Sequence, residues 1–240
     1  MNVALFTGIR ELEVCERSMP ILERPGDVLL QIETVGVCGS DIHYYTEGRI
    51  GGQVIEHPAT LGHECAGTVV EVGPAVAELK AGQRVAIDPA ISCGWCDQCE
   101  QGRSHTCRNL KFLGCPGQAP GAAAEYITID AGSCYPIPDS MTMVQAALVE
   151  PLSVAIHAQN IAGMQPGDAV GILGSGPIGL SVLLAVGALC PGRTYVTDLL
   201  DNRLELAKRC GADWIGVPTD ENVVESILNE EPDGLDCVFE

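Results

Sequence analysis

The sequence has 240 residues, of which 46% are hydrophobic, so it can form one large or two ordinary globular domains. Its formal net charge of −19 repels phosphate backbones and anionic lipid, so we expect no nucleic-acid partner and no membrane partner. No apolar run approaches the roughly 20 residues that span a bilayer, and Met1 to Arg10 lacks the pattern of a secretion signal. These features predict a soluble, cytoplasmic protein.

The first part of the chain has the pattern of an all-β domain. Between Val28 and about Tyr135, short segments rich in β-branched residues alternate with glycine and proline. The low aromatic content of 4% and the 28 glycines also favour short strands joined by tight turns over long helices. We expect strands in residues 28–37, 67–73, 84–89 and 124–129.

A longer segment rich in alanine and leucine follows, from Met141 to Ala162, and it predicts a helix. Asp139 or Ser140 is the expected N-cap, and Gly163 the expected end. We place the domain boundary inside this helix, which gives a catalytic domain in residues 1–152 and a nucleotide-binding domain in residues 153–240.

The second domain has the alternating pattern of a parallel α/β fold. Apolar strand segments and helical segments follow one another as βαβαβαβ. The strands are expected at 169–174, 193–198, 212–217 and 234–240, and the helices at 177–190, 202–211 and 221–230.

Four cysteines with metal-ligand spacing lie in one loop. They form a C-x2-C-x2-C-x7-C pattern, made by Cys93, Cys96, Cys99 and Cys107. Four thiolates fill the tetrahedral coordination of zinc and leave no open position, so the pattern predicts a structural zinc site. The alternative is a cluster of free thiols in a surface loop.

A second set of metal-ligand residues is dispersed along the chain: Cys38, His63, Glu64 and Glu150. One thiolate, one imidazole and carboxylates are the ligands of a catalytic zinc with an exchangeable position. Spacing alone leaves the alternative open that these are ordinary core and surface residues.

A glycine-rich loop begins the second domain. Gly174, Gly176 and Gly179 form G-x-G-x-x-G between an apolar strand and an apolar helix, a pattern typical of dinucleotide binding. Asp198 follows the next strand at the spacing of the acidic residue that binds the adenosine ribose, which favours NAD over NADP. We expect Ile178 to pack beside the cofactor. For the loop as a whole, the alternative is a glycine-rich turn that binds no ligand.

The segment Gly62-His63-Glu64-x2-Gly67-x5-Gly73-x2-Val76, followed by the four-cysteine loop, resembles the signature of zinc-dependent medium-chain dehydrogenases. Within that superfamily, VCGSDIHYY and VEPLSVAIHA are most similar to segments of sorbitol, xylitol and related polyol dehydrogenases. The resemblance implies a GroES-like catalytic domain followed by a partial Rossmann domain, one catalytic and one structural Zn²⁺, and NAD as cofactor.

The resemblance also implies roles for individual residues. Cys38 and His63 bind the catalytic zinc together with Glu64, while Glu150 binds the metal or its water. Ser40 and His43 relay the alcohol proton, Tyr44 contacts the substrate, and Arg203 lies near the adenosine. The alternatives are a turn residue for Ser40, packing for His43 and Tyr44, and a helix-surface charge for Arg203.

The activity implied is hydride transfer from a secondary hydroxyl of a polyol to NAD⁺, giving a ketose. The substrate is thus a small polyol or alcohol. A threonine-type or simple alcohol dehydrogenase, and a non-enzymatic zinc-binding remnant, remain alternatives. Relatives of this kind continue for about another hundred residues, so we expect an incomplete chain and, for the complete protein, a homo-oligomer.

Overall fold

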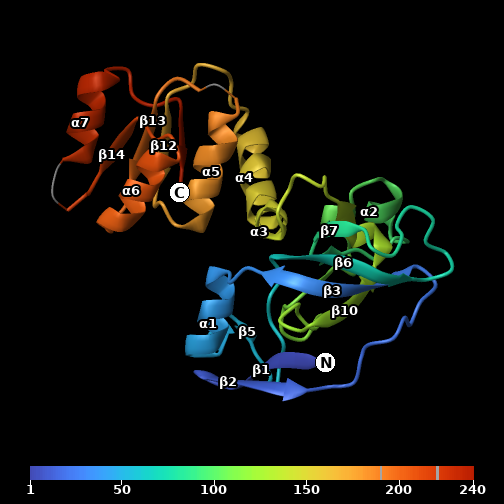
Figure 1. Ribbon diagram of the computed structural model, residues 1–240. Helices are drawn as coiled ribbons and strands as arrows, with labels where there is room; N and C mark the ends of the chain where they lie inside the picture. The colour runs from blue at the N-terminus through green and yellow to red at the C-terminus, as the bar shows by residue number, and fades with distance from the viewer. Residues whose placement is uncertain (190, 220–221) are drawn as a thin grey trace. The chain divides into compact units, whose positions relative to one another are not determined.

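The computed structural model describes residues 1–189, 191–219 and 222–240, which form two compact units, Met1–Glu150 and Pro151–Glu240 (Figure 1). Cys190 and Glu221, the last and first residues of two expected helices, lie outside the described residues. Within the described part of the chain, no helix is long and apolar enough to cross a membrane.

The first unit consists mainly of short strands. Its strands are β1 (Asn2–Gly8), β2 (Glu11–Glu16), β3 (Asp27–Val35), β4 (Arg49–Ile50), β5 (Gln53–Val54), β6 (Cys65–Val72), β7 (Arg84–Ile87), β8 (Ala90–Ile91), β9 (Lys111–Phe112), β10 (Tyr126–Asp130) and β11 (Cys134–Pro136). Its helices are α1 (Gly39–Glu47), α2 (Asp97–Glu100) and α3 (Met143–Ala147), and 3-10 turns cover Ser104–Thr106 and Ala131–Ser133. The expected β-rich domain is confirmed.

An antiparallel five-stranded sheet, in the order β10-β3-β6-β7-β11, carries the main core of this unit. Val28, Leu30 and Val69 are fully buried on one face of the sheet, and Leu29, which points to the other face, is buried as well. The β3–β6 register ends with Val35 opposite Cys65. The residues that follow β3 therefore lie beside those that precede β6, and these two segments carry Cys38, His63 and Glu64.

The expected helix from 141 to 162 consists of two helices, α3 and α4 (Val149–Ala162). The expected N-cap, Asp139 or Ser140, is wrong, because Thr142 caps α3 through a capping box with Gln145. The T-x-x-Q spacing of Thr142 and Gln145 is the sequence signal for this helix start. Pro151 in the first turn of α4 favours a new helix start, since it has no N–H to donate to a preceding turn.

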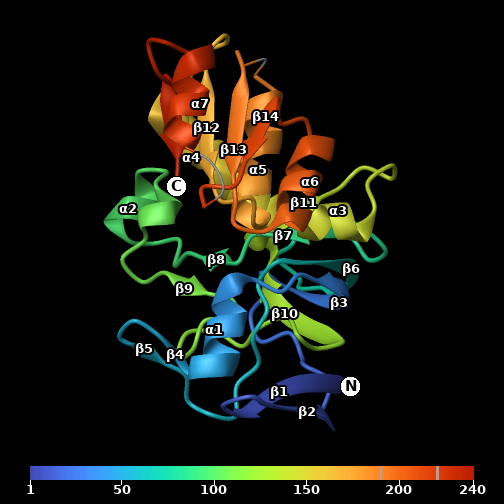
Figure 2. The ribbon, with the colours of Figure 1, turned by 90° about the vertical axis from the view of Figure 1, so that its left-hand side faces the viewer.

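The second unit contains a parallel sheet with strand order β14-β13-β12-β15, and Figure 2 shows β12, β13 and β14 side by side. The strands are β12 (Val170–Leu173), β13 (Thr194–Thr197), β14 (Trp214–Gly216) and β15 (Cys237–Phe239). The connecting helices are α5 (Pro177–Gly187), α6 (Asp201–Arg209) and α7 (Val223–Glu230). All three strand pairings are parallel, so the expected α/β fold is confirmed.

The topology of this sheet indicates where a ligand would bind. The chain moves outward from β12 through β13 to β14 and then returns to β15 on the other side of β12. The strand order therefore reverses beside β12, and open α/β sheets bind ligands at the carboxyl ends of strands at such a switch point. Gly174 follows β12 directly, and Asp198 follows β13.

Candidate active site and metal centres

The dispersed residues Cys38, His63 and Glu64 converge in the first unit. One ligand atom from each lies within 4.8 Å of the others. Cys38 is the N-cap of α1, while His63 and Glu64 directly precede β6. His63 and Glu64 are buried, and Cys38 is half-buried.

Two neighbours hold this cluster in place. Asp41 accepts a hydrogen bond from the Cys38 N–H at 3.0 Å, and its other oxygen lies 3.9 Å from His63 Nδ1. Gly36 donates its N–H to the Glu64 carbonyl at 2.6 Å, and the Glu64 side chain occupies the space where a Cβ on Gly36 would lie. Asp41 thus holds the Cys38 backbone and places a carboxylate beside the imidazole, and Gly36 leaves space for the Glu64 side chain.

The pKa shifts follow from this crowding. A hydrogen bond from His63 lowers the pKa of Cys38, aided by Ser40 and opposed by burial. Burial alone would lower the pKa of His63, but Cys38, Asp41 and Glu150 together raise it. Acceptor groups outnumber cations here, so the donor set fits a divalent metal ion such as zinc.

Glu150 lies near this cluster without joining it. Its carboxylate is outside the group of three ligand atoms that converge within 4.8 Å, although its charge contributes to the raised pKa of His63. Burial raises the pKa of Glu150 itself; His63 opposes the increase, while Glu64 adds to it. The geometry therefore separates Glu64, inside the cluster, from Glu150, beside it.

The three other candidates for substrate chemistry lie on α1. The Ser40 hydroxyl is hydrogen-bonded to Cys38. The His43 side chain is 59% exposed, and its Nδ1 lies 3.4 Å from Glu47 Oε1. Tyr44 is only 5% exposed; it belongs to an apolar cluster and donates its hydroxyl hydrogen to Gln53 at 3.0 Å. This placement favours the packing alternative for Tyr44.

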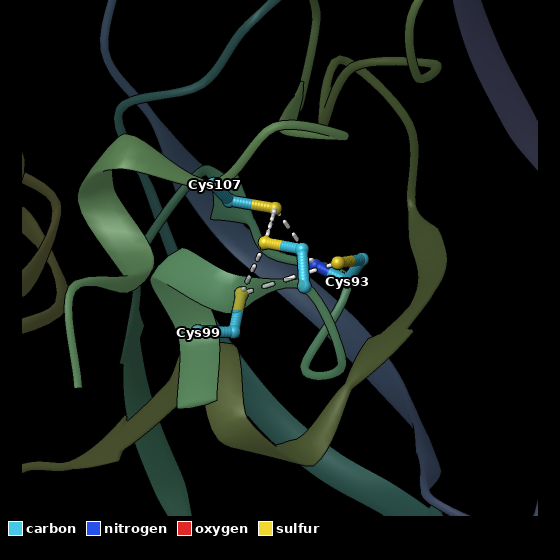
Figure 3. Close-up of side chains that lie close together, drawn as sticks. Cys93, Cys99 and Cys107 are labelled. Carbon is cyan, nitrogen blue, oxygen red and sulfur yellow. Dashed lines mark hydrogen bonds between the residues drawn. The ribbon is translucent and has the colours of Figure 1, made fainter. Parts of the chain in front are cut away.

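The four-cysteine loop gathers all its thiols around one point (Figure 3). Sulfur–sulfur distances are 3.5 Å for Cys96–Cys99, 3.9 Å for Cys96–Cys107 and 4.0 Å for Cys93–Cys99. Zinc bound tetrahedrally at about 2.3 Å from each sulfur separates the sulfurs by about 3.8 Å. The spacing therefore fits a zinc ion.

Hydrogen bonds prepare some of these sulfurs to be thiolates. Burial raises the pKa of Cys93, but the backbone of Trp95 and the Asn109 side chain outweigh it and lower the value to about 6. Burial and the neighbouring thiol of Cys96 raise the pKa of Cys99 to about 11. Deprotonation of Cys99 is therefore disfavoured unless a cation neutralises the charge.

The glycine-rich loop in the second unit shows a different need for each glycine. Gly174 has a φ of +93°, and a Cβ on Gly179 would lie 1.8 Å from the Gly174 carbonyl oxygen, so the fold itself requires both. A Cβ on Gly176, the N-cap of α5, would meet only Arg203 Nη1, at 3.8 Å. The fold does not require Gly176, whereas close approach of a pyrophosphate to the backbone would require it.

Asp198 lies at the edge of this loop. One carboxylate oxygen, Oδ2, accepts the Ser175 N–H at 2.8 Å and its hydroxyl at 3.2 Å, and Arg203 Nη1 is 3.7 Å away. Burial raises the pKa of Asp198, but the hydrogen bonds from Ser175 and Leu200 lower it more. Asp198 is therefore an anion beside the loop, and Arg203 forms an ion pair with it. Ile178 is half-exposed at the start of α5.

Sequence reasoning overlooked three residues of these sites. Asp41 stands three residues after a cysteine that begins a helix, which is a capping-box spacing. Ser175 lies between two glycines of the loop, where a polar side chain can reach the following strand. Nothing in the sequence pattern marks Gly36.

Comparisons with known proteins agree with this architecture. The model of the family "Alcohol dehydrogenase GroES-like domain" matches residues 24–139. The chain is 41% identical to sorbitol dehydrogenase from Bacillus subtilis, over all of this chain and 68% of that protein. It is also 41% identical to L-idonate 5-dehydrogenase from Vitis vinifera, over 88% of this chain and 57% of that protein.

A solved structure from Escherichia coli, described as a short chain alcohol dehydrogenase complexed with NADH, superposes with a TM-score of 0.88 and 31% identity. The match covers 99% of this chain and 68% of that one. The chain thus spans between 57% and 68% of the lengths of these proteins. It belongs to the zinc-dependent medium-chain dehydrogenase/reductase superfamily, among its polyol dehydrogenase-like members.

Proposed function

We propose that the protein oxidises a secondary hydroxyl of a small polyol to a ketone with NAD⁺ as hydride acceptor. The observation that carries this proposal is the convergence of a thiolate, an imidazole and a carboxylate in one unit of a chain whose other unit has a dinucleotide-binding loop. The similarity to a sorbitol dehydrogenase supports a polyol as substrate.

Cys38, His63 and Glu64 would hold the catalytic zinc, because their ligand atoms converge and both His63 and Glu64 are buried. Bound there, zinc supplies a Lewis acid that lowers the pKa of a hydroxyl group. Glu150, beside the cluster, would accept a hydrogen bond from water or substrate, or replace Glu64 as ligand. The four cysteines of the loop would hold the structural zinc.

Proton removal would use α1. Ser40 lies next to Cys38, and His43 follows three residues later, so the two share one side of the helix. Ser40 would pass the hydroxyl proton on, and the exposed His43 would release it to solvent. Tyr44 would support α1 from the core, with a substrate contact as the alternative role.

The loop from Gly174 to Gly179 would bind the pyrophosphate of NAD. When bound, NAD⁺ supplies a nicotinamide ring that accepts the hydride. Asp198 would accept hydrogen bonds from the adenosine ribose and repel a 2′-phosphate, with Arg203 and Ile178 beside it. We expect Asp198→Ala to weaken NADH binding more than NADPH binding, measured by titration of each dinucleotide. Equal weakening of both would contradict the ribose role.

We also propose that the protein is cytoplasmic and that the complete protein forms a homo-oligomer. All described cysteines are free, which suits a reducing compartment. The oligomer rests on the family resemblance.

The test is NADH formation by the zinc-loaded protein with sorbitol, xylitol, galactitol, threonine and ethanol. Turnover of a sugar alcohol above the other substrates supports the proposal. Preference for threonine or ethanol would favour another activity of the superfamily, and absence of turnover with zinc and NAD bound would favour a non-enzymatic zinc protein.

A further inference from the structure

Ser175 is the residue between the first two glycines of the loop, and it is only 1% exposed. A buried hydroxyl is costly unless it is hydrogen-bonded. Here both the hydroxyl and the backbone N–H of Ser175 donate to the same atom, Asp198 Oδ2, at 3.2 and 2.8 Å. The serine side chain therefore joins the glycine loop to the carboxylate after the next strand.

The two oxygens of Asp198 consequently differ in what they can still bind. Oδ2 accepts two hydrogen bonds from Ser175 and faces Arg203 at 3.7 Å. Oδ1 accepts one hydrogen bond, from the Leu200 N–H at 3.0 Å. Each carboxylate oxygen has about two acceptor sites, so Oδ1 retains one for a ligand hydroxyl.

We infer that Ser175 is a positioning residue that fixes the rotamer of Asp198, so that Oδ1 meets the adenosine ribose and the chain discriminates NAD from NADP. This inference rests on the proposed function. Without the serine hydroxyl, Oδ2 keeps one backbone hydrogen bond and the nearby guanidinium of Arg203. The carboxylate then turns toward Arg203, and it presents a poorer acceptor to the ribose and less negative charge to a 2′-phosphate.

The experiment measures dissociation constants of NADH and NADPH by fluorescence titration for the wild type, Ser175→Ala, Asp198→Ala and the double variant. Losing the serine hydroxyl's hydrogen bond, at the strength of an ordinary hydrogen bond, predicts that Ser175→Ala lowers the preference for NADH over NADPH by about threefold to tenfold. In the Asp198→Ala background the same substitution should leave the preference unchanged, because the residue it positions is gone.

Ser181→Ala is the matched control. Ser181 is also buried and lies in α5, but its hydroxyl donates to the Pro177 carbonyl at 2.8 Å and does not contact Asp198. This variant should keep the wild-type preference even if it unfolds at a lower temperature, which separates positioning from stability.

Three results would overturn the inference. An unchanged preference in Ser175→Ala would show that the hydroxyl does not position Asp198, and an equal change in the Asp198→Ala background would show that Ser175 acts by another route. Failure of the wild type to bind either dinucleotide would instead contradict the proposed function itself, and the inference with it.

Discussion

Gly36 tests the metal cluster at the scale of one residue. A Cβ at this position would lie 2.3 Å from Glu64 Oε2 and 2.9 Å from Glu64 Cβ, and the second contact cannot be relieved by rotating the carboxylate. We expect Gly36→Ala to cost about 1–3 kcal/mol of stability and to lower zinc occupancy at the cluster of Cys38, His63 and Glu64.

Thermal unfolding and zinc analysis measure both effects. Gly52→Ala is the control, because a Cβ there meets nothing within 4 Å and the backbone is not left-handed. Full zinc content and unchanged stability in Gly36→Ala would show that Glu64 does not depend on this space.

Individual site residues were predicted to different extents by the sequence. Cys93, Cys96, Cys99 and Cys107 lie close together in the chain, so their spacing was sufficient to predict a cluster. The convergence of Cys38 with His63 depends on the β3–β6 register, which sequence spacing does not determine. The shared metal role of the two residues was implied only by the family resemblance. Tyr44 was ambiguous because an aromatic side chain packs equally well against a core or a ligand.

In the glycine loop that leads into α5, one glycine is required by the packing of the fold and another is expected to be required for NADH binding. Gly179→Ala would drive a Cβ into the Gly174 carbonyl, so we expect it to lower both stability and NADH affinity. Gly176→Ala meets only the end of Arg203, so we expect normal stability but weaker NADH binding, since the backbone approach is blocked.

Urea unfolding and NADH titration of these two variants give the comparison. Loss of stability in Gly176→Ala, or unchanged NADH affinity in that variant, would show that Gly176 serves the fold and not a ligand.

The start of α3 gives a second prediction at this scale. Thr142 accepts the Gln145 N–H at 3.2 Å, and Gln145 Oε1 accepts the Thr142 N–H at 2.8 Å. Losing an N-cap side chain costs about 1 kcal/mol, so Thr142→Ala should lower the urea midpoint, whereas Ser140→Ala at an exposed position should not. A lower urea midpoint for Ser140→Ala than for Thr142→Ala would instead support Ser140 as the N-cap.

Elements were predicted better than their ends. The short β-branched segment of β3 and the apolar run of β12 were sufficient to place both strands. The single helix expected over 141–162 was wrong because apolar composition continues through Leu148, whereas local capping and Pro151 divide it. Pairings in the five-stranded sheet, such as β10 with β3, join segments that are far apart in the chain, so the sequence could not supply them.

The whole molecule combines two clusters of potential metal ligands in the first unit with a glycine-rich loop, typical of dinucleotide binding, in the second. The two clusters share no residue, and the segments of the chain that carry one cluster do not carry the other. We therefore expect the two metal sites to fill independently, so that losing one leaves the other intact.

Zinc content per chain, measured by elemental analysis together with NAD-linked polyol oxidation, tests the central claim most directly. We predict two zinc ions and turnover for the wild type and for Cys15→Ser, a substitution outside both clusters, and one ion without turnover for Cys38→Ser. Loss of both ions from Cys38→Ser, or turnover that survives this substitution, would contradict the account.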